Sequence, residues 1–408
     1  MTLLRKGLQN ILKISASDVV FVSALRTPVT RATKGGFKDA HPEELLSHIL
    51  KATLERTKID PSLIEDITIG SVLQELGGAK AGRMSMLHAG FPHTTCFNTV
   101  NRQCSSGLQA ITNVAYAIQV GAINIGIGGG MESMTRNYGS RAIPVDLSSE
   151  LRRSPVQDAL DCIMPMGITS ENVAERYGIT RADLDAFAVA SHIKASRAQA
   201  AGHFTSEIVP TPTRWINPDD PTDVTTRIIK EDDGIRHTAS AESMAKLKPA
   251  FKSDGTSTAG NSSQVSDGSA AALMMRRDTA EKLGYEVLGR FVATQIAGCR
   301  PDEMGIGPAI AIPKLLEATG IEVGEVDVWE LNEAFASQAL YCIRKLGIDM
   351  AKVNPNGGAI ALGHPLGATG ARQLATLLPE LRRTGKDVGV VSMCIGTGQG
   401  LASLIMRE

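Results

Sequence analysis

The sequence predicts a layered α/β fold in which one structural unit occurs twice. Short apolar stretches typical of buried strands alternate with helical patterns in both halves of the 408-residue chain. Three features of the first half recur in the same order in the second half, displaced by roughly 260 residues. The stretch between the halves differs, because it is rich in proline. We therefore expect two duplicated α/β units and an inserted loop domain.

The repeat is visible in three pairs of segments. Residues 65–70 correspond to 325–330, Val100-Asn101 corresponds to Val353-Asn354, and 123–127 correspond to 388–391. Each pair alone is a weak match, but three pairs in one order indicate a duplication. A helix is expected after Cys104, on Leu108, Ile111, Ala115 and Ile118, and its counterpart from Thr369 to Leu378.

These patterns predict the domain boundaries. Residues 1–17 form an N-terminal leader, 18–134 together with 261–286 form the first unit, and 287–408 form the second. Residues 135–260 form the inserted loop domain, with a charged helix near 181–201. Loops on a rigid scaffold are where ligand contacts concentrate, so this insertion is the expected ligand-binding part. The first unit resumes near Gly260, with a strand from Ala270 to Met275.

Composition excludes several classes of function. The chain is 43 % hydrophobic and 21 % charged, as in soluble globular proteins. Its net charge of −1 gives no basic footprint for nucleic acid. No apolar run approaches the roughly 18 residues that a transmembrane segment needs. We therefore expect neither a nucleic-acid partner nor a transmembrane segment.

The N-terminal segment has two interpretations. It contains basic residues and no acid, with apolar residues at helical spacing, which resembles an organelle-targeting segment. The residues are Arg5, Lys6 and Lys13, with Leu4, Leu8, Ile11 and Leu12. A frayed leader before the first strand explains the same pattern equally well.

The six cysteines are widely spaced and include no Cys-x-x-Cys pair. Neither a zinc site nor a disulfide framework is indicated, so we expect no bound metal and a reducing compartment. Four of the six are expected to be small buried apolar residues. They are Cys96, Cys162, Cys299 and Cys342.

Cys104 is the clearest candidate for a nucleophile. It lies just before a helical pattern, where unpaired N–H groups and the helix dipole are expected to lower the pKa of its thiol. His364 and Cys394 lie far downstream in glycine-rich turns. One histidine and two cysteines in such turns suggest acyl transfer through a thioester. The run Gly128-Gly129-Gly130 is not a dinucleotide fingerprint and is expected to let backbone segments approach closely.

Four motifs together resemble those of the thiolase family. They are Asn101-Arg102-Gln103-Cys104-Ser105-Ser106-Gly107, Asn332-Glu333-Ala334-Phe335-Ala336, Gly357-Gly358-Ala359-Ile360-Ala361-Leu362-Gly363-His364-Pro365 and Cys394-Ile395-Gly396-Thr397-Gly398. The resemblance extends from about Asp18 to the end of the chain. It is to the peroxisomal 3-ketoacyl-CoA thiolases in particular, as in residues 163–172 and 258–263. It implies the thiolase fold, an α-β-α-β-α core.

The resemblance also implies roles for five residues. Cys104 would attack the keto carbon and carry the acyl group, and His364 would take the proton of its thiol. Cys394 would protonate the leaving acetyl-CoA enolate and deprotonate incoming CoA, tasks suited to a thiol near its pKa. The N–H groups of Cys104 and Gly396 would form one oxyanion-binding pair. His364, with a water held by Asn332, would form the other.

The expected CoA contacts rest on the same resemblance. Arg236 would meet the nucleotide end of CoA, and Ser263 would bind the pantetheine arm. Met166 and Phe335 would line an apolar tunnel. The loop domain would thus bind CoA as a co-substrate, with no permanently bound cofactor.

The leading hypothesis is thiolytic cleavage of 3-ketoacyl-CoA to acetyl-CoA and a shortened acyl-CoA in fatty acid β-oxidation, by a ping-pong route. An acetoacetyl-CoA thiolase is the alternative, although such members usually carry histidine where this chain has Pro165. A non-catalytic lipid carrier of the same fold would be expected to lack Cys104, His364 or Cys394. Decarboxylating ketosynthases typically use two histidines with one cysteine.

Family resemblance also predicts a homodimer and a peroxisomal location. The basic N-terminal segment keeps a mitochondrial location open. Its residues do not form a peroxisomal signal. The C-terminal Met406-Arg407-Glu408 does not form one either.

Overall fold

The computed structural model describes residues 6–408, except for the side chains of 139–141. Its core is a ten-stranded sheet in the order β10-β11-β12-β9-β1-β8-β5-β3-β4, with β2 paired to β8. The strands are β1 (Val19–Arg26), β2 (Thr30–Arg31), β3 (Asp66–Gly70), β4 (Cys96–Val100), β5 (Ile125–Ser133), β8 (Ser266–Arg276), β9 (Gly289–Gly298), β10 (Val328–Leu331), β11 (Val388–Ile395) and β12 (Gln399–Arg407). The buried strands are the near-continuous apolar runs expected of strands covered on both faces.

The sheet displays the duplication. The first half runs β1-β8-β5-β3-β4 and the second runs β9-β12-β11-β10, and the two halves join only where Val19–Phe21 pair with 289–291. β3 and β4 are parallel, and Trp329 of β10 forms a parallel bridge with Val353 in the place equivalent to β4. Val100-Asn101 and Val353-Asn354 thus occupy equivalent places in the two halves, as the repeat predicted.

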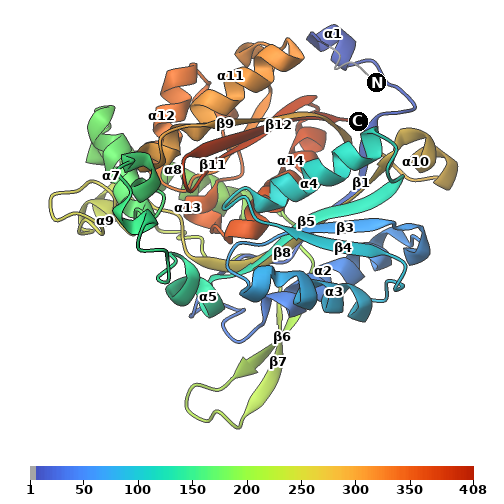
Figure 1. The fold of residues 1–408 in the computed structure, drawn as a ribbon, viewed down its shortest axis with the longest axis horizontal. Coiled ribbons are helices and arrows are strands. Elements are labelled where there is room, and N and C mark those ends of the chain that lie inside the picture. The colour runs from blue at the N-terminus through green and yellow to red at the C-terminus, as the bar shows by residue number, and fades with distance from the viewer. Residues whose placement is uncertain (1–5) are drawn as a thin grey trace.

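The helices and the two halves of the sheet form five layers (Figure 1). α4 (Ser106–Gln119) and α14 (Leu366–Thr384) lie side by side between the two halves of the sheet. α2 (Pro42–Thr57) and α3 (Ala79–His88) cover the outer face of the first half, while α11 (Gly307–Thr319) and α12 (Ala336–Leu346) cover that of the second. The predicted α-β-α-β-α core is confirmed. A buried apolar cluster fills each of the spaces between these layers.

Glycine permits the closest contacts of the central layer. A Cβ on Gly130 would overlap the carbonyl oxygen of Gly367, and one on Gly128 would lie 2.6 Å from the Cα of Ile111. A Cβ on Gly107 would lie 2.7 Å from the same Gly367 oxygen. The interpretation of the 128–130 run as a place of close backbone approach is confirmed.

The loop segment follows the carboxyl end of β5 and meets that of β1, where Arg26 forms a bridge with Ile208. It contains α5 (Met134–Arg141), α6 (Gln157–Asp161), α7 (Met166–Arg176), α8 (Arg181–Ala200), β6 (Thr211–Ile216), β7 (Val224–Ile229) and α9 (Ala241–Ala245). β6 and β7 form a separate hairpin that projects from the body (Figure 1). The remaining helices are α1 (Leu8–Ile11), α10 (Arg277–Leu283) and α13 (Ala359–Leu362). None of the helices within residues 6–408 has the length and apolar character needed to cross a bilayer.

Three local predictions need correction. α14 begins at Leu366, directly after Pro365, and extends to Thr384, beyond the predicted 369–378. Cys394 lies inside β11 and not in the turn that follows it. Cys96 and Cys162 are exposed and Cys299 is half-buried, so of the four cysteines expected in the core only Cys342 is buried. Cys96 is exposed because β4 ends the sheet.

The described part of the N-terminal segment packs against the second half of the chain. Ile11 is 2 % exposed and belongs to the core cluster under α11. The N–H of Gly7 donates to the carbonyl oxygen of Thr319 at 2.7 Å, and Arg290 donates to the carbonyl oxygen of Lys13 at 2.9 Å. The idea of a frayed leader is therefore wrong from Gly7 onward. Residues 1–5 of the predicted leader lie outside the described residues.

Ile11→Ala is expected to lower the free energy of unfolding by about 2 kcal/mol or more, because it leaves a cavity against α11. Ile14→Ala is the matched control, since Ile14 is 65 % exposed and its loss should cost less than about 0.5 kcal/mol. Urea denaturation of both variants measures the difference. Equal, negligible effects would show that this segment is not docked.

Candidate active site

The turn that carries Cys104 is held by side chains on both sides of it. Gln103 has a φ of 46°, a left-handed conformation that is uncommon for a residue with a side chain. The carboxamide oxygen of Asn101 accepts the Gln103 N–H at 2.9 Å. The hydroxyl of Ser106 accepts the Arg102 N–H at 2.9 Å and donates to the Gln103 carbonyl oxygen at 2.6 Å. These bonds stabilise a conformation that projects Cys104 ahead of α4.

The electrostatic prediction for Cys104 was wrong in sign. Burial raises the pKa of its thiol to about 11, and the negative charge of Glu132 acts in the same direction. The N–H groups of Gly396 and of Cys104 itself oppose this shift but do not overcome it. The sulfur lies where the two halves meet, so desolvation by the distant half outweighs the nearby helix. The thiol of Cys104 is therefore neutral at rest, and a nucleophilic role would need a base.

Alkylation of Cys104 should therefore be slow at neutral pH. At pH 8, about three units below its pKa, roughly one thiol in a thousand is ionised. The rate constant for carbamidomethylation of Cys104 by iodoacetamide is expected to rise about tenfold per pH unit between pH 8 and 10, because only the thiolate reacts. Mass spectrometry of the Cys104 peptide measures it. A plateau reached near pH 7 would contradict this assignment.

His364 is a buried neutral base next to α14. Its Nδ1 lies 2.7 Å from the hydroxyl of Thr369, and its Nε2 lies 3.4 Å from the amide nitrogen of Asn332. An amide nitrogen can only donate, so this contact assigns the proton to Nδ1 and leaves Nε2 as the acceptor. Burial, and then the charge of Arg372, lowers the pKa of His364 to about 3. The imidazole is thus unprotonated across the physiological pH range.

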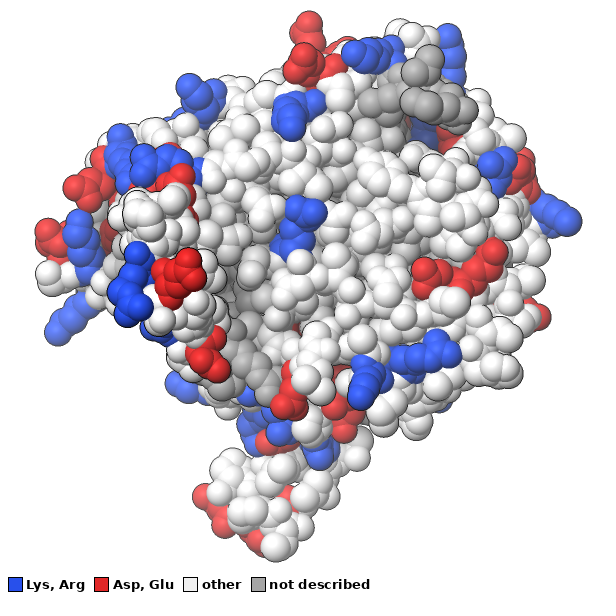
Figure 2. Space-filling model, viewed as in Figure 1, with Lys and Arg blue, Asp and Glu red and all other residues white. Residues whose placement is uncertain are grey.

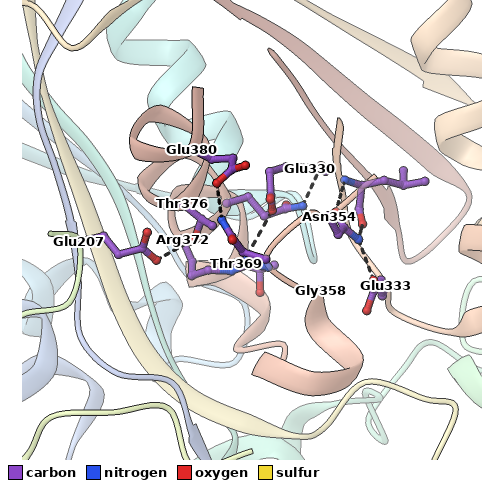
Figure 3. A network of polar contacts seen from close by, with 12 residues as sticks. Glu207, Glu330, Glu333, Asn354, Gly358, Thr369, Arg372, Thr376 and Glu380 are labelled. Carbon is purple, nitrogen blue, oxygen red and sulfur yellow. Dashed lines mark hydrogen bonds and ion pairs between the residues drawn. The ribbon is translucent and has the colours of Figure 1, made fainter. Parts of the chain in front are cut away.

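Asn332 directly follows β10, as predicted, and the residues around it are tightly held. Its N–H donates to the carbonyl oxygen of Ser392 at 2.9 Å. The side chain of Asn354 brackets Leu331, accepting its N–H at 2.9 Å and donating to its carbonyl oxygen at 2.8 Å. The same Asn354 donates to Glu333 at 2.8 Å (Figure 3). Within residues 6–408, no protein group donates to the buried side-chain oxygen of Asn332.

A buried polar network anchors α14 behind His364 (Figure 3). Arg372 pairs with Glu330 of β10 at 3.3 Å. The hydroxyl of Thr376 donates to Glu207 at 2.9 Å, and Glu207 in turn pairs with Arg26 of β1 at 2.6 Å. These contacts tie α14 to both halves of the sheet and to the loop segment, so its N-terminal end is held in place.

Cys394 is the penultimate residue of β11, the strand that packs against α14. It is fully buried in an apolar cluster with Met304, Ala334 and Phe335. Burial, and next the charge that Cys104 would carry, raises the pKa of its thiol well above the ordinary value. The expectation of a thiol near its pKa is therefore wrong for the free protein. Cys394 is protonated at rest and is poised to act first as an acid.

The turn after Cys394 places an N–H group at the nucleophile. The N–H of Gly396 faces the sulfur of Cys104 and favours its ionised form. Positive φ occurs at Thr397 (71°) and Gly398 (86°) and not at Gly396. A Cβ on Gly396 would make ordinary contacts at 3.7 Å, whereas one on Gly398 would overlap the carbonyl oxygen of Cys299. The steric need for glycine falls on Gly398.

Three of the four predicted CoA contacts gather around Cys394. Met166, the first residue of α7, packs on the cluster that contains Cys394 and Phe335. Phe335 also meets Phe251 edge to face, with ring centroids 6.1 Å apart. The N–H of Ser263 donates to the carbonyl oxygen of Ala334 at 3.0 Å. Segments from the loop domain and from both halves of the sheet thus meet at one point.

The fourth contact, Arg236, is exposed and lies on the loop surface. Its N–H donates to Nδ1 of His192 at 3.1 Å. Its loop is linked to His364 through Gln264, whose side chain donates to the carbonyl oxygen of Gly234 at 2.7 Å. The carbonyl oxygen of Gln264 accepts the N–H of His364 at 3.1 Å. Arg236 thus lies on an exposed loop that is linked to His364 through Gln264.

Sequence reasoning missed the residues that hold the candidate site residues in place. Thr369 and Gln264 bond to His364, and Asn354 bonds to Leu331, the neighbour of Asn332. Only Asn354 had a signal, because the repeat matches it to Asn101. Asn101 plays the same part in the first half, donating to the carbonyl oxygen of Val72 beyond β3 at 3.2 Å. The duplication was therefore a clue to function as well as to fold.

The site brings two protonated thiols, a neutral imidazole and a carboxamide to the meeting point of the halves. Such a set can form an acyl-thioester and move protons in either direction. Across residues 6–408, no three His, Cys, Asp or Glu side chains are arranged to hold a metal ion.

Comparison with known proteins agrees with this chemistry. The family description "Thiolase, N-terminal domain" matches residues 19–278, and "Thiolase, C-terminal domain" matches residues 285–407. The chain is 54 % identical over 391 residues to the peroxisomal 3-ketoacyl-CoA thiolase B of Rattus norvegicus, covering 96 % of this chain and 91 % of that protein. It is 52 % identical over 403 residues to the peroxisomal 3-ketoacyl-CoA thiolase of Yarrowia lipolytica, covering 99 % and 96 %.

A solved structure shows the same fold. The dimeric peroxisomal thiolase of Saccharomyces cerevisiae superimposes with a TM-score of 0.90 at 47 % identity, covering 98 % of this chain and all of that one. Two family domains that together span almost the whole chain, and relatives above 50 % identity, establish the assignment. The chain belongs to the thiolase family.

Proposed function

We propose that this protein is a 3-ketoacyl-CoA thiolase, an acetyl-CoA C-acyltransferase of fatty acid β-oxidation. The observation that carries the proposal is the proximity of Cys104 to Cys394 and to the N–H of Gly396, two groups from the other half of the chain. His364 lies beside Asn332 in that same half. The relatives described above bear the same name. The presence of all three residues argues against a non-catalytic lipid carrier.

In the first half-reaction the sulfur of Cys104 attacks the keto carbon of the substrate. Nε2 of His364 accepts the thiol proton, which a thiol with a pKa of about 11 will not release alone. The bond between Cα and Cβ then breaks, leaving the acyl group on Cys104 and an acetyl-CoA enolate. Cys394 gives its proton to the enolate carbon, and acetyl-CoA leaves.

In the second half-reaction CoA takes the acyl group. The Cys394 thiolate accepts the proton of the CoA thiol, and the CoA sulfur attacks the carbonyl carbon of acyl-Cys104. The carbonyl oxygen becomes negative in this step and is stabilised by the N–H groups of Cys104 and Gly396. His364 returns its proton to the departing Cys104 sulfur. For the thioester oxygen of the substrate, we assign His364 and a water held by the side-chain oxygen of Asn332, a buried acceptor.

CoA is assigned to the loop domain, residues 135–260, as a co-substrate with no resident cofactor. Met166 and Phe335 would contact the pantetheine arm on the apolar side, and Ser263 would bind it through its hydroxyl. Arg236 is exposed, as a side chain that meets a solvated phosphate would be. The predicted division into a leader, two units and a loop domain is kept here as a proposal.

We propose that the protein works as a homodimer in the peroxisome, as the descriptions of its relatives indicate. β4 ends the sheet, so its outer edge is available for pairing. Figure 2 shows that the centre of the face bearing α4 is almost free of charged side chains. α3, α4 and the residue that ends α4 include exposed apolar side chains, namely Met84, Leu87, Tyr116 and Val120. Such a surface is typical of an interface.

Activity across acyl-chain length tests the proposed function. Purified protein is supplied with CoA and with acetoacetyl-CoA or 3-ketoacyl-CoA of ten or sixteen carbons, and loss of the 3-ketoacyl-CoA is followed. We expect higher kcat/KM for the longer substrates. Activity confined to acetoacetyl-CoA would instead assign the protein to the acetoacetyl-CoA thiolases, and no cleavage of any substrate would indicate a carrier.

A further inference from the structure

Glu132 is a fully buried acid that the proposed reaction does not use. It is the penultimate residue of β5, at the carboxyl end of the strand, within the first half of the sheet. A buried carboxylate is costly unless its oxygens accept hydrogen bonds. Its three partners are all backbone N–H groups, and they come from two separate elements of the site.

Two of these partners belong to the segment beyond β3. The N–H of Val72 donates to Oε2 of Glu132 at 3.1 Å, and the N–H of Leu73 donates to Oε1 at 3.3 Å. The carbonyl oxygen of Val72 accepts the side chain of Asn101, which also holds the turn before Cys104. Glu132 is therefore linked to the turn before Cys104 through the backbone of Val72–Leu73 and the side chain of Asn101.

The third partner belongs to the other half of the chain. The N–H of Gly367 donates to Oε2 of Glu132 at 3.0 Å. Gly367 is the second residue of α14, and no side chain at the N-cap of this helix supplies an acceptor. Glu132 thus caps, from the opposite half, the 19-residue helix whose start follows His364 and Pro365. A negative charge there also complements the helix dipole.

Steric contacts make this junction rigid. A Cβ on Gly367 would lie 2.8 Å from the Cα of Ser71 and 3.0 Å from Oε2 of Glu132. The backbone of α14 therefore rests directly on the end of β3, with the carboxylate between them. Moving either α14 or the segment after β3 would break a hydrogen bond to Oε2 of Glu132.

We propose that Glu132 is a positioning residue for thiolysis: its carboxylate joins the Val72–Leu73 segment to the N-terminus of α14 and so fixes His364 relative to Cys104. The inference deepens the proposed function and depends on it. Proton transfer between these two side chains requires hydrogen-bond distance. A misplacement of about 1 Å can cost roughly a hundredfold in rate, so a rigid link here has a large effect.

The electrostatic surroundings allow the positional role to be separated from a charge effect. Two titratable groups face Glu132, namely Asp267 of β8 and Cys104 itself. Both the burial of Glu132 and the charge of Asp267 disfavour its ionised form, whereas the three N–H donors favour it. The charge of Glu132 raises the pKa of Cys104 and so does nothing to activate the nucleophile. A benefit to catalysis must therefore come through geometry.

Glu132→Asp provides the test, because it keeps the charge and shortens the side chain by one methylene. We expect kcat to fall about ten- to a hundredfold, with KM for 3-ketoacyl-CoA and for CoA within about twofold of wild type. The pH dependence of Cys104 alkylation by iodoacetamide should stay as in wild type, because the thiol keeps its surroundings. Asp267→Asn is the matched control: it alters a buried carboxylate on the neighbouring strand that bonds to Ser133 and Thr135 and not to α14.

Gly367→Ala is the second variant, in case Glu132→Asp does not fold. Its added methyl group would push on the same junction from the side of α14, and it should give the same fall in kcat with unchanged KM. Asp267→Asn should lower the melting temperature yet keep kcat within about threefold of wild type.

The inference is overturned if a folded Glu132→Asp or Gly367→Ala enzyme keeps wild-type kcat, or if the loss appears as a raised KM. A change in Cys104 alkylation that parallels the loss of kcat would indicate a collapsed site and would equally overturn it. Failure of the proposed function is distinguishable, because the wild-type protein itself would then not cleave 3-ketoacyl-CoA.

Discussion

Cys104→Ala is expected to reduce thiolysis by at least about 10⁴-fold, because no other group in the site can carry the acyl chain. Cys394, the other thiol of the proposed site, lies in an apolar cluster, and burial keeps it protonated. Two measurements check this: the initial rate of 3-ketoacyl-CoA cleavage, and the mass of the protein after incubation with acyl-CoA. Wild-type protein should gain one acyl group on the Cys104 peptide, and the variant should gain none.

The matched control for this substitution is Cys96→Ala. Cys96 lies on the edge strand β4, and its side chain is exposed. Its replacement should leave both kcat and the acyl adduct on Cys104 unchanged. Thiolysis by Cys104→Ala above about one per cent of the wild-type rate, or an acyl group found on another residue, would contradict the assignment of the nucleophile.

The placement of the candidate catalytic side chains could be predicted because the duplication constrains it. Cys104 precedes α4 in the first half and His364 precedes α14 in the second, and the packing of α4 against α14 joins the two halves although these residues are far apart in sequence. The motifs around Cys104, His364 and Cys394 then supplied the residue types. The same logic located Asn332 at the end of its strand.

The ionisation states could not be predicted in this way. The position of Cys104 before α4 suggested a lowered pKa, but the structure gives a raised one because burial desolvates the sulfur. The pKa of Cys394 is also raised, because this residue lies inside a buried strand and not in the adjacent turn. Burial by distant segments is a property of the tertiary structure, and it outweighs local effects here.

Orienting residues were missed for a related reason. Thr369 carries no sequence signal beyond its helix, and its contact with His364 depends on α14 starting three residues earlier than the periodicity indicated. The acceptor role of Glu132 toward Gly367 depends on a contact between residues 235 apart in the sequence. Neither relation could be derived from a single chain without its fold.

Cys394→Ala is expected to impair proton transfer at the acetyl-CoA carbon more than proton transfer from the CoA thiol. Exchange of the acetyl-CoA methyl hydrogens with deuterium oxide should fall about 10²- to 10⁴-fold, the usual contribution of a positioned acid or base. Transfer of an acyl group between CoA and Cys104 should fall less. The reason is that a free thiol, with an ordinary pKa near about 8.5, ionises appreciably in water, whereas a carbon acid does not.

The pH dependence of the Cys394→Ala enzyme sharpens this expectation. Raising the pH from 7 to 9 ionises more of the CoA thiol and should partly restore the acyl-transfer half-reaction in the variant. Hydrogen exchange should not recover in the same range, because the enolate still lacks its acid and base. NMR of the acetyl group and single-turnover deacylation of acyl-Cys104 measure the two processes separately.

Cys342→Ala is the matched control for Cys394→Ala. Cys342 is an equally buried thiol that donates to the carbonyl oxygen of Gly305 at 3.5 Å, and it packs in the core of the second half. Its loss should cost stability and leave both processes near wild type. Equal losses of exchange and of acyl transfer in Cys394→Ala would contradict the acid–base role and point instead to a collapsed oxyanion site. A selective loss of exchange would fix Cys394 as the group that moves the proton to and from carbon.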